Sequence, residues 1–417
     1  MSAEIQRTID AVWRIESARI VATLAKVTGD VGLAEDLAQE ALVEALEQWP
    51  EAGVPRNPGA WLTLVAKRRA IDGWRRSARL HERERLLAAD LAIDLATDQP
   101  DPEPIDDDVL RLIFTACHPV LARPAQVAMT LRVVAGLTTD EIARMTFEPV
   151  ATVQARITRA KKTLAAANVP FETPPANEWA ERLSGVLGVI YLIFTEGYVA
   201  TGGDRWVRED VAHEALRLGR QLAALLPQEP EVHGLVALME LQASRFRART
   251  APDGSPILLD DQDRSRWDHP QIRRGIIALD RADACAGSRL TGRGSFALQA
   301  AIAREHSVAP SVAATDWEAI VILYEALGRI APNPVVELNR AVAVSMAEGP
   351  ATALLIVDRL ASAGQLRGSH LLPSVRGELL SRLERREEAR VEFLAAAALT
   401  SNERQRAVLQ DKADANR

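Results

Sequence analysis

Residues 136–162 have the sequence GLTTDEIARMTFEPVATVQARITRAKK, and this stretch decides the fold that we expect. It predicts a short helix, a tight turn and a second helix, the layout of a helix-turn-helix whose second helix enters the major groove of DNA. Thr138 or Thr139 can N-cap the first helix, and Glu141 lies in its first turn, where the helix dipole favours an acid. The residues expected to form the small core between the two helices are Leu137, Ile142, Ala143, Val153 and Ile157.

The polar face of the second helix is basic, and no acid occurs among residues 149–168. Its polar positions are Thr152, Gln154, Arg156, Thr158, Arg159, Lys161 and Lys162. Gln154, Arg156 and Arg159 are long enough to reach base edges, whereas threonine and lysine side chains suit phosphate contacts. An ordinary helical hairpin with a solvated basic face is the alternative interpretation.

The composition is that of a soluble globular protein: 417 residues, of which 47% are hydrophobic and 26% charged. Cys117 and Cys285 lie far apart in the sequence, so we expect neither a disulfide framework nor a zinc site. The first residues contain no apolar signal segment, and no run of 18 apolar residues follows. We therefore expect a cytoplasmic protein without a membrane span.

The net charge of −7 conceals a strong segregation of charge along the chain. Residues 56–85 are rich in arginine, whereas residues 86–110 contain eight acids and no base. Two basic elements separated by an acidic linker predict binding to a polyanion, because local fields decide where a polyanion docks.

Helix-favouring alanine, leucine, arginine and glutamate dominate, aromatic residues make up 4%, and alternating β-branched runs are scarce. The sequence therefore predicts an all-α protein. Composition changes divide it into residues 1–85, an acidic linker over 86–107, a helix-turn-helix domain over 108–168 and a larger helical part over 176–417.

Two helices of the first segment carry opposite charge. A helix over residues 30–49 has a polar face that includes Glu35, Asp36, Gln39 and Glu40. A helix that begins near Pro58 carries Trp61, Lys67, Arg68, Arg69, Arg75 and Arg76. Cations neutralise phosphates and flat rings stack on unpaired bases, so the second helix suits a nucleic-acid strand. In the alternative interpretation, the tryptophans belong to the core and the arginines form a solvated face.

These segments carry a resemblance to a known family. AEDLAQEA (34–41), PGAWLTLVAKRRAID (58–72) and the helix-turn-helix resemble, in this order, regions 2 and 4 of extracytoplasmic-function (ECF) sigma factors of the sigma-70 family. The likeness covers roughly residues 10–168. The remainder resembles the helical, tetratricopeptide-like extension found on some members.

The resemblance implies a role for each segment in transcription initiation. Glu35, Asp36, Gln39 and Glu40 would bind core RNA polymerase. Trp61, Lys67, Arg68, Arg69, Arg75 and Arg76 would read and open the −10 promoter element, and the polar residues of the second helix of the helix-turn-helix would read the −35 element.

The C-terminal part predicts helix pairs around residues 334–357 and 373–394. They align at an offset of 38 residues when Ala351 is set on Ala389 and Leu355 on Phe393. Its scattered histidines and the lack of nucleotide or hydrolase motifs predict no enzyme, no cofactor and no metal.

The predicted function is therefore a sigma factor with a fused regulatory domain. Its expected partners are core RNA polymerase, promoter DNA, and a regulatory protein or an intramolecular contact made by the C-terminal domain. Two alternatives stay open: a free-standing helix-turn-helix regulator with a ligand-sensing helical domain, and a helical scaffold or enzyme with a DNA-binding tether.

Overall fold

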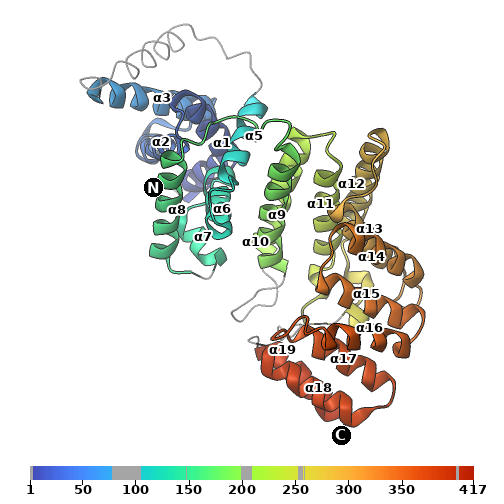
Figure 1. Cartoon of the computed structure of the whole chain (residues 1–417). Coiled ribbons are helices and arrows are strands. Elements are labelled where there is room, and N and C mark those ends of the chain that lie inside the picture. The colour runs from blue at the N-terminus through green and yellow to red at the C-terminus, as the bar shows by residue number, and fades with distance from the viewer. Residues whose placement is uncertain are drawn as a thin grey trace. The chain divides into compact units, whose positions relative to one another are not determined.

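The computed structural model describes residues 3–77, 105–146, 148–198, 209–251, 257, 259–400 and 403–417. Among these residues the regular secondary structure is helical and no β-strand occurs, as the sequence predicts (Figure 1). The chain divides into two compact units, Met1–Ile193 and Phe194–Arg417. The division falls within helix α9.

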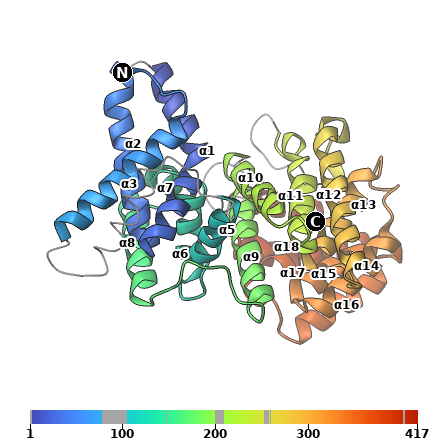
Figure 2. The same ribbon diagram turned by 90° about the horizontal axis from the view of Figure 1, so that it is seen from above.

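The first unit contains two groups of helices. The first group is α1 (Ala3–Thr28), α2 (Val31–Ala52) and α3 (Pro58–Ser77). The second is α5 (Ile105–Ala116), α6 (Arg123–Met129), the π-helical turn η1 (Thr130–Val134), α7 (Thr139–Thr146) and α8 (Val150–Ala166), followed by α9 (Trp179–Tyr198). Figure 2 shows α1, α2 and α3 side by side.

Local chemistry sets the ends of α2, which we expected over residues 30–49. Asp30 is its N-cap and accepts hydrogen bonds from the backbone N–H groups of Gly32 (2.6 Å) and Leu33 (3.1 Å). Gly53 closes the other end by donating to the carbonyl of Trp49. The face of α2 toward α1 and α3 is rich in alanine, with Ala34, Ala38, Ala41 and Ala45 fully buried. Small side chains allow close helix packing there.

The predicted acidic linker lies mostly outside the described residues, which resume at Ile105. Residues 105–107, expected to be its last residues, instead open α5. The segment between α8 and α9 contains no helix, and the first half of α9 packs against α5. There the rings of Phe114 and Trp179 lie 5.1 Å apart, and Arg182 donates a hydrogen bond to the carbonyl of Phe114 (3.1 Å).

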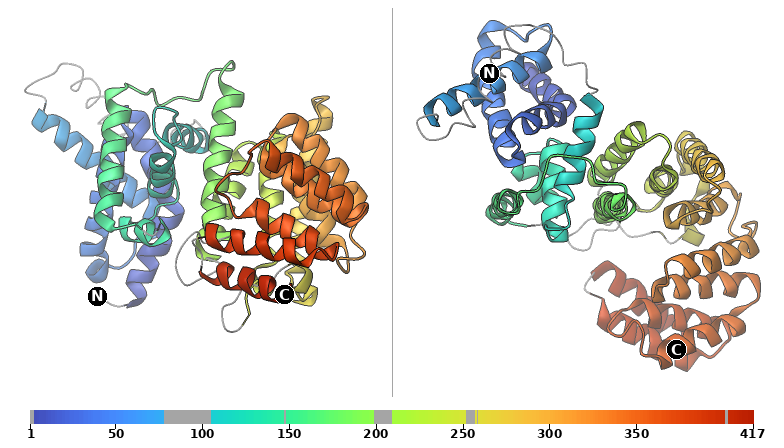
Figure 3. Two further views of the ribbon diagram at one scale, coloured as in Figure 1. Left: turned by 60° about the horizontal axis from the view of Figure 1, so that its bottom comes forward. Right: turned by 45° about the horizontal axis from the view of Figure 1, so that its top comes forward.

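The second unit is a succession of antiparallel helices (Figures 1 and 3). They are α10 (Glu209–Leu225), α11 (Pro230–Ala243), α12 (His269–Ser288), α13 (Ser295–Val308), α14 (Trp317–Ile330), α15 (Pro334–Ala347), α16 (Pro350–Ser362), α17 (Leu371–Arg382), α18 (Arg386–Leu399) and α19 (Glu403–Ala415), with short 3-10 turns η2 (Phe246–Ala248), η3 (Leu259–Asp261) and η4 (Arg264–Arg266). From α14 to α19 each helix packs against the next.

The C-terminal helix pairs are present, but the predicted offset of 38 residues is wrong. Leu355 is 65% exposed whereas Phe393 is 1% exposed, so these two residues are not equivalent. An offset of 36 residues aligns buried positions instead: Ala353 with Ala389 and Val357 with Phe393. The same offset places buried Ala341 on Gly377 and Val344 on Leu380.

Candidate nucleic-acid interface

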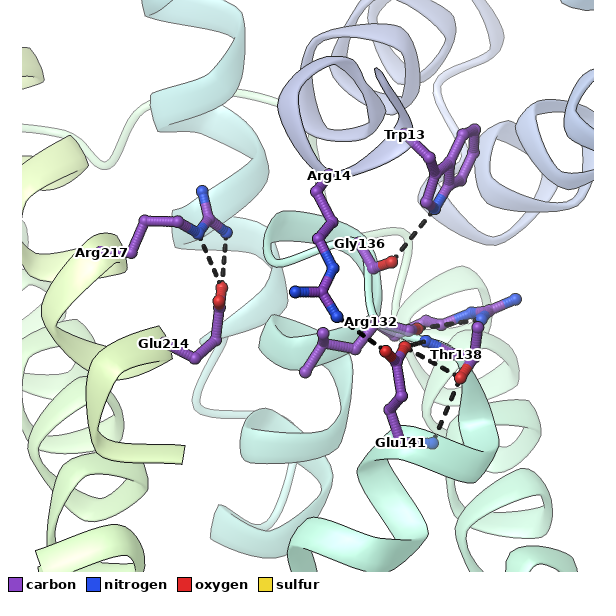
Figure 4. A network of polar contacts seen from close by, with 9 residues as sticks. Trp13, Arg14, Arg132, Gly136, Thr138, Glu141, Glu214 and Arg217 are labelled. Carbon is purple, nitrogen blue, oxygen red and sulfur yellow. Dashed lines mark hydrogen bonds and ion pairs between the residues drawn. The ribbon is translucent and has the colours of Figure 1, made fainter. Parts of the chain in front are cut away.

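The first helix of the helix-turn-helix begins with a reciprocal cap. The hydroxyl of Thr138 accepts a hydrogen bond from the backbone N–H of Glu141 (3.2 Å), and the Glu141 carboxylate accepts one from the backbone N–H of Thr138 (2.8 Å) (Figure 4). This capping box fixes the start of α7. Burial raises the pKa of Glu141, but hydrogen bonds from Thr138 and Arg14 outweigh burial, so the pKa lies below its ordinary value.

The small core of the helix-turn-helix is confirmed. All five side chains assigned to it are buried: Leu137, Ile142, Ala143, Val153 and Ile157. Pro149 is the N-cap of α8, with φ −60° and ψ 140°. A proline there loses no helical hydrogen bond and directs the chain into the second helix.

Most polar side chains of α8 point to the surface. The exposed ones are Thr152, Gln154, Thr158, Arg159 and Lys162. Gln154, Thr158, Arg159 and Lys162, together with Ala151 and Ala155, belong to the lining of a hollow of about 480 Å³. These residues share one face of α8, so a row of polar side chains long enough to reach base edges is presented together.

Arg156 differs from its neighbours on α8 because it is held inside the helix-turn-helix. Both of its terminal nitrogens donate to the carboxylate of Glu148, in the turn before the helix. The hydrogen bonds from Arg156 hold the pKa of Glu148 below its ordinary value, and those to Glu148 raise the pKa of Arg156. The sequence suggested a base-reading side chain, and the structure gives it a partner at the turn.

Lys161 also has partners within the chain, on a helix far away in sequence. Its ammonium group pairs with the carboxylates of Glu35 and of Asp36, the latter at 2.7 Å. The Glu35 side chain is only 3% exposed, although the sequence placed it on the polar face of α2 that was expected to bind core polymerase. Its other oxygen accepts a hydrogen bond from Nε of Arg132 (2.7 Å).

The other polar side chains expected on the α2 face are more accessible to solvent than Glu35. The Asp36 side chain is 66% exposed, Glu40 is exposed and Gln39 is half-buried. Glu40 pairs with Arg69 on α3 at 3.1 Å, and Glu44 pairs with the same guanidinium at 2.8 Å. The hydrogen bond to Glu44 raises the pKa of Arg69 above its ordinary value.

The residues expected at the −10 element therefore fall into different environments on α3. Arg68 is exposed, Lys67 is half-buried, and Arg69 is engaged by α2. The ring of Trp61 is half-buried edge-on against buried Trp49, with centroids 5.4 Å apart. The helix extends through Arg75 and Arg76, whose side chains lie outside the described residues.

Three residues of this region escaped the sequence reasoning. Trp13 on α1 donates from Nε1 to the carbonyl of Gly136 (3.1 Å), and Arg14 donates to Glu141 (2.8 Å) (Figure 4). The third is Arg132, which is the only charged residue in the apolar run 131–135. A charge in such a run needs a partner when it is buried, and this is the one signal in the sequence that could have pointed to an acidic partner.

Comparison with known proteins places these elements in families. The family model "Sigma-70 region 2" matches residues 14–80, and "Sigma-70, region 4" matches residues 111–164. A third model, "Family of unknown function (DUF6596)", matches residues 182–283. No solved structure is significantly similar to the chain.

Two individual relatives are similar to the chain over different lengths. An uncharacterized protein of Rhizobium meliloti (strain 1021) is 44% identical over 388 residues, which cover 92% of this chain and 90% of that protein. The probable ECF RNA polymerase sigma factor SigI of Mycobacterium tuberculosis is 27% identical over 171 residues, 40% of this chain and 58% of that protein.

Neither a membrane span nor a metal centre is found in the part of the chain that the structure describes. No helix there has the length and apolar character needed to cross a membrane. No group of three or more His, Cys, Asp or Glu side chains in those residues could hold a metal ion.

The two sigma-70 regions, the ECF relative and the helical C-terminal part together show that the chain belongs to the ECF-type sigma factors of the sigma-70 family, with a long helical extension.

Proposed function

We propose that the acidic face of α2 docks on core RNA polymerase, that α3 holds the opened −10 element and that α8 reads the −35 element. In this assignment residues 1–85 and 108–168 are the two promoter-binding domains, joined by the acidic linker over 86–107. The observation that carries the proposal is the helix-turn-helix, since α8 exposes Gln154, Arg159 and Lys162 on one face.

The chemistry of the exposed groups supports this division of labour. Arg159 suits guanine O6 and N7, and Gln154 suits adenine N6 and N7. Lys162 and Thr152 suit phosphates, which fix register without reading sequence. Asp36 and Glu40 give α2 an exposed negative face, which favours rapid and oriented docking on a basic partner.

We further propose that residues 176–417 form a regulatory or interaction domain. Its helices stack in order from α14 to α19, an arrangement that exposes extended surfaces suited to protein contacts. Deletion of this part should change promoter output in cells. Unchanged output at equal protein level would contradict a regulatory role.

Gel filtration with purified core RNA polymerase tests the central proposal. The wild-type chain should co-elute with the polymerase, and a variant with Asp36→Lys and Glu40→Lys should not. Glu47→Lys provides the control, because Glu47 is exposed on the same helix about three turns beyond Asp36 and about two turns beyond Glu40. Loss of binding in both variants alike would point to net charge and contradict a defined docking face.

Binding to duplex promoter DNA, measured for the free chain and for its complex with core polymerase, separates a sigma factor from a free-standing regulator. A sigma factor should bind duplex promoter DNA weakly alone and strongly as part of the holoenzyme. Tight binding of the free chain to duplex DNA, with no association with the polymerase, would instead establish the free-standing regulator.

A further inference from the structure

Within the first unit, the candidate docking helix α2 and the candidate reading helix α8 hold each other. The buried carboxylate of Glu35 on α2 receives two cations, Nε of Arg132 at 2.7 Å and the ammonium group of Lys161 on α8. Lys161 also bonds Asp36 at 2.7 Å. We call these four residues the ionic latch.

The latch is built as an interior feature. The side chains of Glu35, Arg132 and Lys161 are 3%, 14% and 15% exposed. A carboxylate with so little access to water must be paired, and separation of α2 from both η1 and α8 would leave it without its cations unless another partner supplied them. The latch therefore favours the arrangement in which α2 stays packed against η1 and α8, as long as no other basic surface reaches Glu35. We call this the closed arrangement.

Contacts away from the latch hold the same two groups of helices together. Trp13 bonds the carbonyl of Gly136 (3.1 Å), Arg14 bonds Glu141 (2.8 Å), and Lys26 pairs with Asp108 (3.7 Å). Helix α1 also packs along α5. The closed arrangement thus has both an apolar and an ionic basis.

We propose that the ionic latch keeps the free sigma factor inactive, because it occupies the α2 acids with cations of the −35 reading domain and must open before α2 can dock on the polymerase. This inference rests on the proposed function of α2. Core polymerase would compete for Glu35 and Asp36, and its docking would release Lys161 to DNA. Polymerase binding and availability of the reading helix are thereby coupled through the same carboxylates.

A disulfide across the latch tests the proposal directly. A Cβ at Gly32 would lie 3.1 Å from the Cβ of Lys161, slightly closer than the ~3.5–4.5 Å of a disulfide, so a small shift suffices. The full chain with Gly32→Cys and Lys161→Cys should therefore crosslink under mild oxidation. The native thiols should not interfere, since both are buried and burial raises the pKa of Cys117 to about 11.

The oxidised double variant should bind core polymerase at least about tenfold more weakly than its reduced form, and reductant should restore binding. The single variants Gly32→Cys and Lys161→Cys should bind equally well in both conditions. Absence of the disulfide in the free chain would disprove the closed arrangement. Equal binding of the oxidised and reduced forms would disprove its inhibitory role.

Opening the latch should have the opposite effect. Arg132→Gln removes one cation without altering any residue assigned to docking or reading, and it should tighten polymerase binding by about threefold or more. Unchanged or weaker binding by a folded Arg132→Gln chain would contradict the latch. If neither the wild-type chain nor the reduced double variant binds polymerase, the proposed function is overturned, and the inhibitory role with it. The yield of the disulfide would still show whether the free chain adopts the closed arrangement.

Discussion

The indole Nε1 of Trp13 donates a hydrogen bond to the carbonyl oxygen of Gly136 over 3.1 Å, although 123 residues separate the two in sequence. Gly136 is the residue at which the chain turns from η1 toward the helix-turn-helix, with φ +70°. Ser17, one turn after Trp13 on α1, lies so close that a Cβ at residue 136 would be 2.3 Å from its Oγ. Helix α1 thus contacts this turn at a position where only glycine fits.

This contact predicts that Gly136→Ala destabilises the first unit by more than the cost of a positive φ. Gly29→Ala is the matched control, because Gly29 has φ +69° and a Cβ added there would meet nothing within 4 Å. The control should cost about 1–2 kcal/mol, and Gly136→Ala should cost about 1–3 kcal/mol more because of overpacking. Urea unfolding of the full chain measures both. Adding Ser17→Ala to Gly136→Ala should recover part of the difference, and no recovery would show that the Oγ contact is not the cause.

Neighbouring arginines on α3 should have separable roles. Arg68 is exposed, whereas Arg69 is bound by Glu40 and Glu44. Arg68→Ala should weaken holoenzyme binding to a single-stranded −10 fragment and lower the salt slope by about 1, as expected for a lost phosphate contact. Arg69→Ala should mainly lower stability, by about 1 kcal/mol or less, since its ion pairs are partly exposed. Titrations over a range of salt concentrations distinguish the two, and a larger DNA effect from Arg69→Ala would reverse the assignment.

Two exposed residues of α8 should have different effects on DNA binding, because Arg159 is expected to contact a base and Lys162 a phosphate. Arg159→Ala should cost about 1–3 kcal/mol at the preferred −35 sequence and relax the preference at one base position. Lys162→Ala, on the same exposed face, should weaken binding to all sequences alike. Selection of −35 elements from a randomised promoter pool by each holoenzyme measures the two effects. A selected motif that is identical for wild type and Arg159→Ala would exclude Arg159 as a base-reading residue.

The parts of the fold that local sequence determines could be predicted. The capping box at Thr138, the core around Ile142 and Val153, and the start of α3 at Pro58 follow from short-range spacing and helix chemistry. The burial of Glu35 could not be predicted in this way, because its cations come from Arg132 and Lys161, 97 and 126 residues further along the chain. Pairing over such distances depends on how the helices pack, and a polar periodicity does not record it.

The predicted offset between the C-terminal helix pairs was wrong for a related reason. Setting Ala351 on Ala389 and Leu355 on Phe393 gave an offset of 38, yet Ala351 and Leu355 are both exposed and the helices pack through other small residues. Ala353 and Ala389 are both fully buried, and Gly377 lies so near Phe393 that an added Cβ would be 2.9 Å from its ring. Close approach at small residues sets the offset of 36, whereas Leu355 remains at the surface.

The second unit should lose stability in mild acid because of His306 on α13. Burial, followed by the charges of Arg245 and Arg264, lowers the pKa of His306 from 6.5 to about 4, and its ring lies edge-on against Trp317 with centroids 5.2 Å apart. Between pH values of about 6.5 and 4 the unfolded chain therefore binds a proton that the folded chain does not. Stability from this residue is fully present above that window and is lost as the pH falls through it, by up to about 3 kcal/mol.

Hydrogen exchange in α13 and α14 of the full chain, corrected for intrinsic rates, measures this loss between about pH 7 and about pH 5. His306→Phe keeps an aromatic ring against Trp317 but cannot take up a proton, so its protection should fall much less over the same range. His269→Gln is the control, because His269 is exposed and should leave the wild-type pH dependence unchanged. An equal fall in the wild-type and His306→Phe chains would exclude His306 as the source of the acid sensitivity. Carboxylates such as Glu337, whose pKa lies below its ordinary value, keep their charge over this range.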